Sequence, residues 1–162
     1  MPKDKRILNI GCGERLIPNA VNIDTWPGKG VQVCDITNGL PFEDNEFDEA
    51  IADYVLCQIC DKEKFRFVMN SVWRVLKPGG LFKIKVPNAE FPESFRDPMD
   101  CRYFIPATFT HFDPRHYRFR IFHYGFKPWK ILKLDRIGNQ SNPQNKNRLY
   151  VEMQKIINET NL

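Results

Sequence analysis

The chain has 162 residues, of which 42% are hydrophobic and 27% are charged, and its net charge is +4. This length fits one domain, and the composition excludes wholesale disorder. No apolar run approaches the ~18 residues that a membrane-spanning helix needs, and the first residues lack the apolar core of a secretory signal. We therefore expect a single cytoplasmic domain over residues 1–162 that contacts no membrane.

The N-terminal half alternates short apolar runs with turn residues. Strands are predicted over residues 7–10, 20–23, 31–34, 48–52 and 81–86. Gly11 follows the first of them, and an aspartate follows each of the next three. One helix is predicted over residues 64–76, where apolar side chains recur at helical spacing, and the Lys77-Pro78-Gly79-Gly80 run ends it.

The C-terminal half is less regular. Residues 88–128 are rich in Phe, Pro, Arg and His without a clean period. Residues 129–134 and 149–157 are predicted strands, with a polar turn over residues 138–147 between them. Short strands separated by helices or loops are typical of an α/β domain with a mostly parallel sheet, to which we expect an antiparallel addition at the C-terminal end.

The ends of the predicted strands carry residues that suit a ligand. Ligands of open parallel sheets bind outside the carboxyl ends of the strands, so we expect Asp24, Asp35 and Asp53 to converge there with the Gly11–Gly13 turn. Leu16 stands where a dinucleotide fingerprint needs a small residue, and no Gly-Lys-Ser/Thr run follows to make a P-loop. Carboxylates can accept from ribose hydroxyls and from the adenine amino group. This combination indicates an adenosine ligand without a pyrophosphate.

A series of motifs resembles the class I S-adenosylmethionine-dependent methyltransferases, in a shortened, methyltransferase-type-11-like branch. The motifs are Leu8-Asn9-Ile10-Gly11-Cys12-Gly13, Asn22-Ile23-Asp24, Cys34-Asp35-Ile36, Leu40-Pro41-Phe42, Phe47-Asp48, Val55-Leu56 and Leu76-Lys77-Pro78-Gly79-Gly80. The resemblance implies a Rossmann-like α/β fold, with a seven-stranded, mostly parallel sheet and an antiparallel C-terminal strand in a three-layer sandwich. Residues 7–88 would form the cofactor-binding half, and residues 89–162 the substrate side and the C-terminal strands.

The resemblance also implies S-adenosylmethionine as the cofactor and a role for several residues. Gly11 and Gly13 would face its methionine part. Asp24 would hold the ribose hydroxyls, and Asp35 with the Ile36 backbone would hold the adenine. The remaining residues of the implied cofactor site are Asn9, Cys12, Thr25 and Asp53. Asp24 and Asp35 could each instead be turn acids, a common use of aspartate.

Catalytic residues are sought where the methyl group would react. The resemblance places Asp53 and Tyr54 there, although Asp53 could instead cap a helix. His111 is selected as a candidate acid–base group. Met99 and Asp100 stand where a segment of the shortened branch has Thr and His, so a base supplied by that His is missing here. Other candidates for an acid–base group are His116, His123 and Tyr103.

Two positions depart from the family's pattern. Asn9 stands where an acid is common, and Arg15 where a third glycine is common. Residues 11–19 and 24–30 alone connect the first three strands, whereas parallel crossovers usually take a dozen or more residues. We therefore expect shortened N-terminal crossovers, a thinly covered apolar sheet surface, and self-association as a homodimer.

The chain has five cysteines, which are Cys12, Cys34, Cys57, Cys60 and Cys101. An odd number in a chain of this kind does not indicate a disulfide framework. The Cys57-x-x-Cys60 pair has no second pair at zinc spacing, so no metal site is predicted. We interpret the pair as small, largely buried hydrophobic residues near a helix start.

The resemblance predicts an enzyme, a methyltransferase that acts on a small-molecule or glycan-type acceptor. Two alternatives stay open. The stretch from Arg115 to Arg136 has seven cationic residues and the single acid Asp135, which would suit a nucleic-acid methyltransferase. The other alternative is a non-catalytic subunit with the cofactor fold that serves a partner enzyme.

Overall fold

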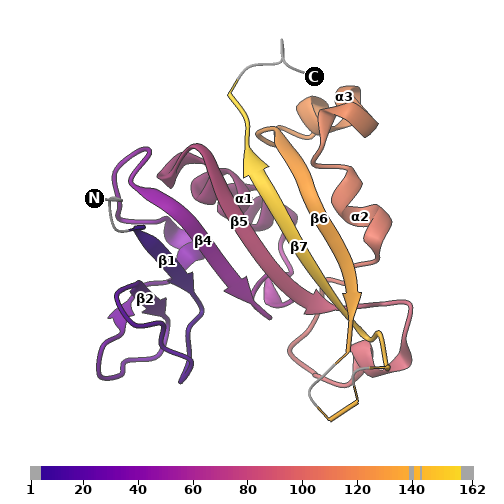
Figure 1. The fold of residues 1–162 in the computed structure, drawn as a ribbon, viewed down its shortest axis with the longest axis horizontal. Coiled ribbons are helices and arrows are strands. Elements are labelled where there is room, and N and C mark those ends of the chain that lie inside the picture. Colours follow the sequence, from indigo (N-terminus) through magenta and orange to yellow (C-terminus); the bar gives the residue numbers. More distant parts are fainter. Residues whose placement is uncertain (1–4, 139–140, 143, 158–162) are drawn as a thin grey trace.

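The computed structural model describes residues 5–138, 141–142 and 144–157, and a seven-stranded sheet forms its centre (Figure 1). The strand order is β3-β2-β1-β4-β5-β7-β6. The strands are β1 (Ile7–Ile10), β2 (Val21–Asp24), β3 (Gln32–Val33), β4 (Phe47–Asp53), β5 (Leu76–Pro87), β6 (Trp129–Ile137) and β7 (Arg148–Lys155). Strands β1 to β5 pair in parallel, and β7 runs antiparallel to both β5 and β6. The predicted sheet is thereby confirmed.

The longest helix is the one that the sequence predicts. It begins after Asp61, whose side chain accepts hydrogen bonds from the backbone N–H groups of Glu63 and Lys64, at 2.8 Å each. The helix ends at Val75, and β5 follows at once. The helical elements are η1 (Ile36–Asn38), η2 (Leu56–Gln58), α1 (Lys62–Val75), η3 (Pro92–Phe95), α2 (Pro106–Thr110) and α3 (Pro114–His123). None of these described helices is long and apolar enough to cross a membrane.

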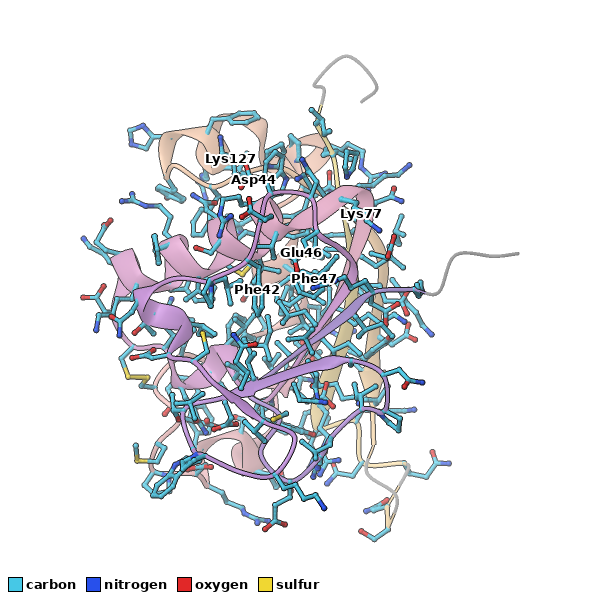
Figure 2. The ribbon with its side chains drawn as sticks, turned by 90° about the vertical axis from the view of Figure 1, so that its left-hand side faces the viewer. Phe42, Asp44, Glu46, Phe47, Lys77 and Lys127 are labelled. Carbon is cyan, nitrogen blue, oxygen red and sulfur yellow. A yellow bond between two sulfur atoms is a disulfide. The ribbon has the colours of Figure 1, made fainter. Side chains whose placement is uncertain are left out.

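One face of the sheet is apolar and covered by helices. Alternate residues of β5 point to it and are fully buried, because side chains on a strand alternate between the two faces. Helices α1, α2 and α3 lie on this side (Figure 1), and the view turned by 90° also shows α1 to one side of the strands (Figure 2). Phe65 of α1 and Phe112, which follows α2, have ring centroids 6.2 Å apart, so the helices share one aromatic core.

The opposite face carries no helix among the described residues, because the chain between β1 and β2 and between β2 and β3 contains none. The crossovers are thus shortened as predicted, but the expected three-layer sandwich is reduced to two layers. The uncovered face is also polar rather than apolar. Glu49 pairs with Lys5 at 2.7 Å and with Lys83 at 2.8 Å, and Asp53 pairs with Lys85 at 2.8 Å. This correction removes the physical reason for the predicted homodimer.

Candidate functional site

A glycine turn follows β1 at the carboxyl edge of the parallel strands. Gly11 has φ +63°, and a Cβ there would lie 2.3 Å from Cγ2 of Val55, so both the backbone conformation and the space require glycine. Gly13 has φ +48°, but a Cβ there would meet no atom within 4 Å. The backbone N–H of Cys12 donates to the carbonyl of Ile23 at 3.0 Å, which fastens the turn to β2.

Asp24 at the end of β2 holds the same turn through its side chain. Its carboxylate accepts from the backbone N–H of Gly13 at 2.8 Å, from that of Trp26 at 3.0 Å and from the hydroxyl of Thr25 at 3.4 Å. Burial opposes the charged form, but these hydrogen bonds outweigh burial and lower the pKa of Asp24 below its usual value. The group is therefore a carboxylate at neutral pH, as the predicted ribose-binding role requires.

Asp35 caps the short helix η1. Its carboxylate accepts from the backbone N–H of Thr37 at 2.9 Å, from the Thr37 hydroxyl at 2.8 Å and from the side-chain amide of Asn38 at 3.1 Å. This is the turn role that the sequence left open for Asp35. The cap also fixes Ile36, which is buried beside the strand ends.

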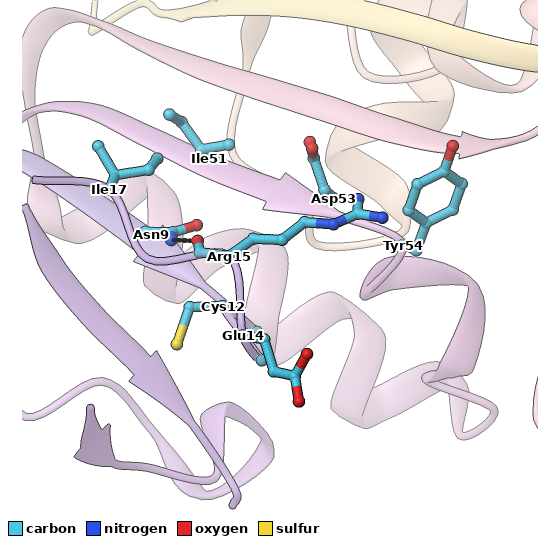
Figure 3. A pocket seen from close by; sticks show the side chains of 10 residues that line it. Asn9, Cys12, Glu14, Arg15, Ile17, Ile51, Asp53 and Tyr54 are labelled. Carbon is cyan, nitrogen blue, oxygen red and sulfur yellow. Dashed lines mark hydrogen bonds between the residues drawn. The ribbon is translucent and has the colours of Figure 1, made fainter. Parts of the chain in front are cut away.

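Three cavities lie along this edge, and we name them by position. The strand-end cavity, of about 360 Å³, is lined by residues that include Gly11, Asp24, Thr25, Asp35, Ile36, Asp53 and Tyr54. The turn cavity, of about 460 Å³, is lined by residues that include Asn9, Gly11, Cys12, Gly13, Arg15, Asp53 and Tyr54 (Figure 3). The outer cavity, of about 550 Å³, is lined by residues that include Tyr54, Gln58, Arg96, Asp97, Asp100 and Arg148. Every residue of the predicted cofactor site thus lines the strand-end cavity, the turn cavity or both.

Tyr54 lines all three cavities. Its φ is +61°, an uncommon conformation for a residue with a side chain, and its backbone N–H donates to the carbonyl of Lys85 at 2.8 Å. Such strained residues cluster at functional sites. Burial raises the pKa of the Tyr54 hydroxyl, although the positive charge of Arg148 opposes the rise. The hydroxyl is therefore protonated at neutral pH and can donate a hydrogen bond.

Asp53 also reaches this junction, as predicted, but it does not cap a helix. It is the last residue of β4, and its carboxylate pairs with Lys85 at 2.8 Å on the uncovered face of the sheet. The pair neutralises both charges. Asp53 therefore brings a local dipole to the cavities rather than a free negative charge.

The histidines do not join this group. His111 directly follows α2, and its Nδ1 lies 3.2 Å from the carbonyl of Ala107. It lines a separate cavity of about 650 Å³ together with His123. His116 is exposed on α3. Because none of these imidazoles lines the three strand-edge cavities, the structure separates His111 from Asp53 and Tyr54.

A disulfide joins Cys60 to Cys101, with Cα atoms 5.4 Å apart, and corrects the expectation that the cysteines stay unpaired. The segment around Cys101 runs beside η2, because the backbone N–H groups of Cys101 and Arg102 both donate to the carbonyl of Cys57 at 2.9 Å. The two cysteines are 41 residues apart in the sequence, and tertiary packing brings them together, so their spacing in the sequence does not predict the disulfide. Burial raises the pKa of the neighbouring Cys57 thiol.

The basic stretch from Arg115 to Arg136 is spread over α3, β6 and the segment between them. Arg115 pairs with the buried Asp113, Arg136 pairs with Glu90 at 2.7 Å, and Lys133 pairs with Asp135 at 3.3 Å. At least three of its cations therefore have carboxylate partners among the described residues, which reduces the positive charge that the stretch offers to a nucleic acid.

Some residues of the site could not be assigned from the sequence. Arg96 and Arg148 are far apart in the chain, yet both line the outer cavity. The sequence shows Arg15 as a departure from the family's pattern but assigns it no role. Gln58 was hidden inside the Cys57-x-x-Cys60 run, and its cavity position follows from the η2 turn.

The N-terminal half of the chain is similar in sequence to known methyltransferases. Residues 12–84 match a family described as a methyltransferase domain. Curated relatives include ubiquinone/menaquinone biosynthesis C-methyltransferase UbiE of Desulfotalea psychrophila, 46% identical over 57 residues (34% of this chain and 22% of the relative), and that of Pasteurella multocida, 39% identical over 64 residues (40% and 21%). The matching segment spans about a fifth of the length of these relatives.

Solved structures share the fold over nearly the whole chain. One is a putative methyltransferase in complex with the Haloferax volcanii Trm112 methyltransferase activator, with a TM-score of 0.67 and 13% identity over 94% of this chain and 83% of that chain. Another is a SAM-dependent methyltransferase from Methanosarcina mazei, with a TM-score of 0.65 and 16% identity over 98% and 95% of the two chains. At these identities the likeness shows a common fold.

Proposed function

We propose that the chain transfers a methyl group from S-adenosylmethionine to a small polar acceptor. Residues 12–84 match a methyltransferase domain, the fold is shared with solved methyltransferases, and the sequence motifs resemble the class I S-adenosylmethionine-dependent family. The observation that carries the proposal is the junction at Tyr54. Tyr54 lines the strand-end cavity and the turn cavity, which the predicted cofactor residues line, and also the outer cavity, which none of those residues lines. A cofactor in the first two would present its reactive group to an acceptor in the third.

The residues present fit the cofactor. Gly11 leaves a space that a Cβ would fill, so a ligand can approach the backbone closely. The Asp24 carboxylate accepts three hydrogen bonds, and a carboxylate has about four lone-pair sites, so it can still accept from a ribose hydroxyl. Asp35 and Ile36 line the same cavity and would hold the adenine. The bound cofactor supplies an activated methyl group on a sulfonium.

The outer cavity suits a small, polar acceptor. Arg96 and Arg148 contribute positive charge to its lining, and Asp97 and Asp100 contribute negative charge. A lining of mixed sign favours an acceptor with both hydrogen-bond donors and acceptors over a purely apolar one. Small metabolites and glycan-type acceptors both meet this description.

Methyl transfer needs positioning more than acid–base chemistry, since it is an in-line displacement. The Tyr54 hydroxyl can orient the methyl-accepting molecule by donating a hydrogen bond to it. If the acceptor atom is a hydroxyl, its proton needs a base. We assign this role to Asp100, because it is the carboxylate of the outer cavity that stands where the resembling segment has its His.

Methyl-labelled cofactor tests the proposal. The protein is incubated with labelled S-adenosylmethionine and, in parallel, with a small-molecule extract or with total RNA. We expect label in the small-molecule fraction and none with the Asp24→Ala variant. Label in RNA would favour the nucleic-acid alternative. Label in neither fraction, from a protein that binds the cofactor, would favour the non-catalytic subunit.

A further inference from the structure

The chain between β1 and β2 lacks a helix, and Arg15 lies in the turn that stands in its place. We propose that the Arg15 guanidinium binds the carboxylate at the amino-acid end of the cofactor. This assignment rests on the proposed function and names a contact that the family resemblance did not supply, since the family commonly has glycine at this position.

Two buried asparagines fix the backbone around Arg15. The Asn9 side-chain amide donates to the carbonyl of Arg15 at 2.9 Å and to Oδ1 of Asn22 at 2.8 Å. Asn22 in turn accepts from the backbone N–H of Ile17 at 2.9 Å and donates to its carbonyl at 3.1 Å. An aspartate at position 9 could not donate to Arg15. The two departures from the family's pattern, Asn9 and Arg15, are therefore one structural unit.

The Arg15 side chain points into the site. Figure 3 shows it extended across the turn cavity toward Asp53 and Tyr54. The charge of Arg15 acts on the Tyr54 hydroxyl, where it favours a lower pKa. Among the described residues no carboxylate lies within 4.0 Å of the guanidinium, and the nearby Asp53 is already paired with Lys85. The guanidinium is therefore available to an anionic ligand.

The shape of S-adenosylmethionine would bring its amino-acid carboxylate into the turn cavity. With adenosine in the strand-end cavity and the sulfonium near Tyr54, the amino-acid end has to pass over the Gly11–Gly13 turn. The strand-end and turn cavities adjoin at this turn, because Gly11, Asp53 and Tyr54 line both of them. Arg15 is the one cation among the described residues that line the turn cavity.

The chemistry of the guanidinium suits this task. Its parallel N–H donors match the two oxygens of a carboxylate, and such charge-assisted pairs are stronger than neutral hydrogen bonds. A helix that begins at this turn would offer an anion its N-terminal partial positive charge. Because no helix follows β1, the Arg15 side chain supplies a positive charge in its place.

Two ligands test the assignment. S-Adenosylhomocysteine has the amino-acid carboxylate, whereas 5′-methylthioadenosine has the same nucleoside without it. We expect the Arg15→Gln variant to bind S-adenosylhomocysteine about 10- to 100-fold more weakly than the unaltered protein, and 5′-methylthioadenosine with the same Kd. Lys130→Gln, on the exposed surface of β6, makes the same change in net charge and should alter neither Kd.

Calorimetric titrations of the three proteins with each of the two ligands distinguish the possible outcomes. Equal binding of S-adenosylhomocysteine by the unaltered protein and Arg15→Gln overturns the assignment and leaves the proposed function standing. Equal loss of both ligands in Arg15→Gln also overturns it, because Arg15 would then support the site as a whole. Failure of the unaltered protein to bind either ligand overturns the proposed function together with the assignment.

Discussion

The close approach of Gly11 to Val55 makes a strong prediction for Gly11→Ala. The left-handed backbone conformation costs a residue with a side chain about 1–2 kcal/mol. The new Cβ would also lie 2.3 Å from Cγ2 of Val55, and such overpacking typically costs about 1–3 kcal/mol. We therefore expect a loss of roughly 3 kcal/mol in the free energy of unfolding, measured by urea denaturation. The displaced Val55 would narrow the strand-end cavity and weaken cofactor binding.

Gly13→Ala is the matched control. Gly13 also has a positive φ, but its Cβ would be in open space, so only the conformational cost of about 1–2 kcal/mol applies. Removing the obstacle with Val55→Ala should restore part of the stability that Gly11→Ala loses, with a coupling energy of about 1–3 kcal/mol in a double-mutant cycle. Equal losses for the two glycine variants together with no coupling to Val55 would refute the steric argument.

Three other perturbations follow from the structure. Reduction of the Cys60–Cys101 disulfide should lower the melting temperature, because a cross-link over a 41-residue separation stabilises the fold by up to about 4 kcal/mol. The control is Cys60→Ser, whose melting temperature should not change when reductant is added. Asn9→Asp should weaken S-adenosylhomocysteine binding in a titration, because the amide that holds Arg15 is lost. The lowered pKa of Asp24 contributes stability above its ordinary pKa, which is lost as pH falls through the lowered value; Asp24→Asn should remove this contribution from an acid unfolding curve.

The sequence was most informative where local signals agree with the fold. Gly11 and Asp24 end apolar runs, and the structure places both at one edge of the sheet. The spacing of apolar residues and the Lys77-Pro78-Gly79-Gly80 run after them predict α1 within two residues of its observed bounds. In each case one short segment carries both the hydrophobic pattern and the residue that ends it.

Features that depend on distant segments could not be predicted. The Cys60–Cys101 disulfide and the outer cavity both arise where the chain after β5 returns beside η2. His111 is one of several histidines among aromatic residues, and only the packing of α2 shows that it lines another cavity. Short crossovers predict a bare apolar face, but the charged side chains of β4 and β5, such as Glu49 with its ion pairs, make this face compatible with water.

The central claim is that the strand-edge cavities hold S-adenosylmethionine, and a thermal melt with S-adenosylhomocysteine tests it most directly. Ligand at about 100 times its Kd stabilises the folded state by about 2.7 kcal/mol. For a domain of this size we expect the melting temperature to rise by roughly 5–10 °C. The Asp24→Ala variant should show no rise. An unchanged melting temperature of the unaltered protein at millimolar ligand would contradict the claim.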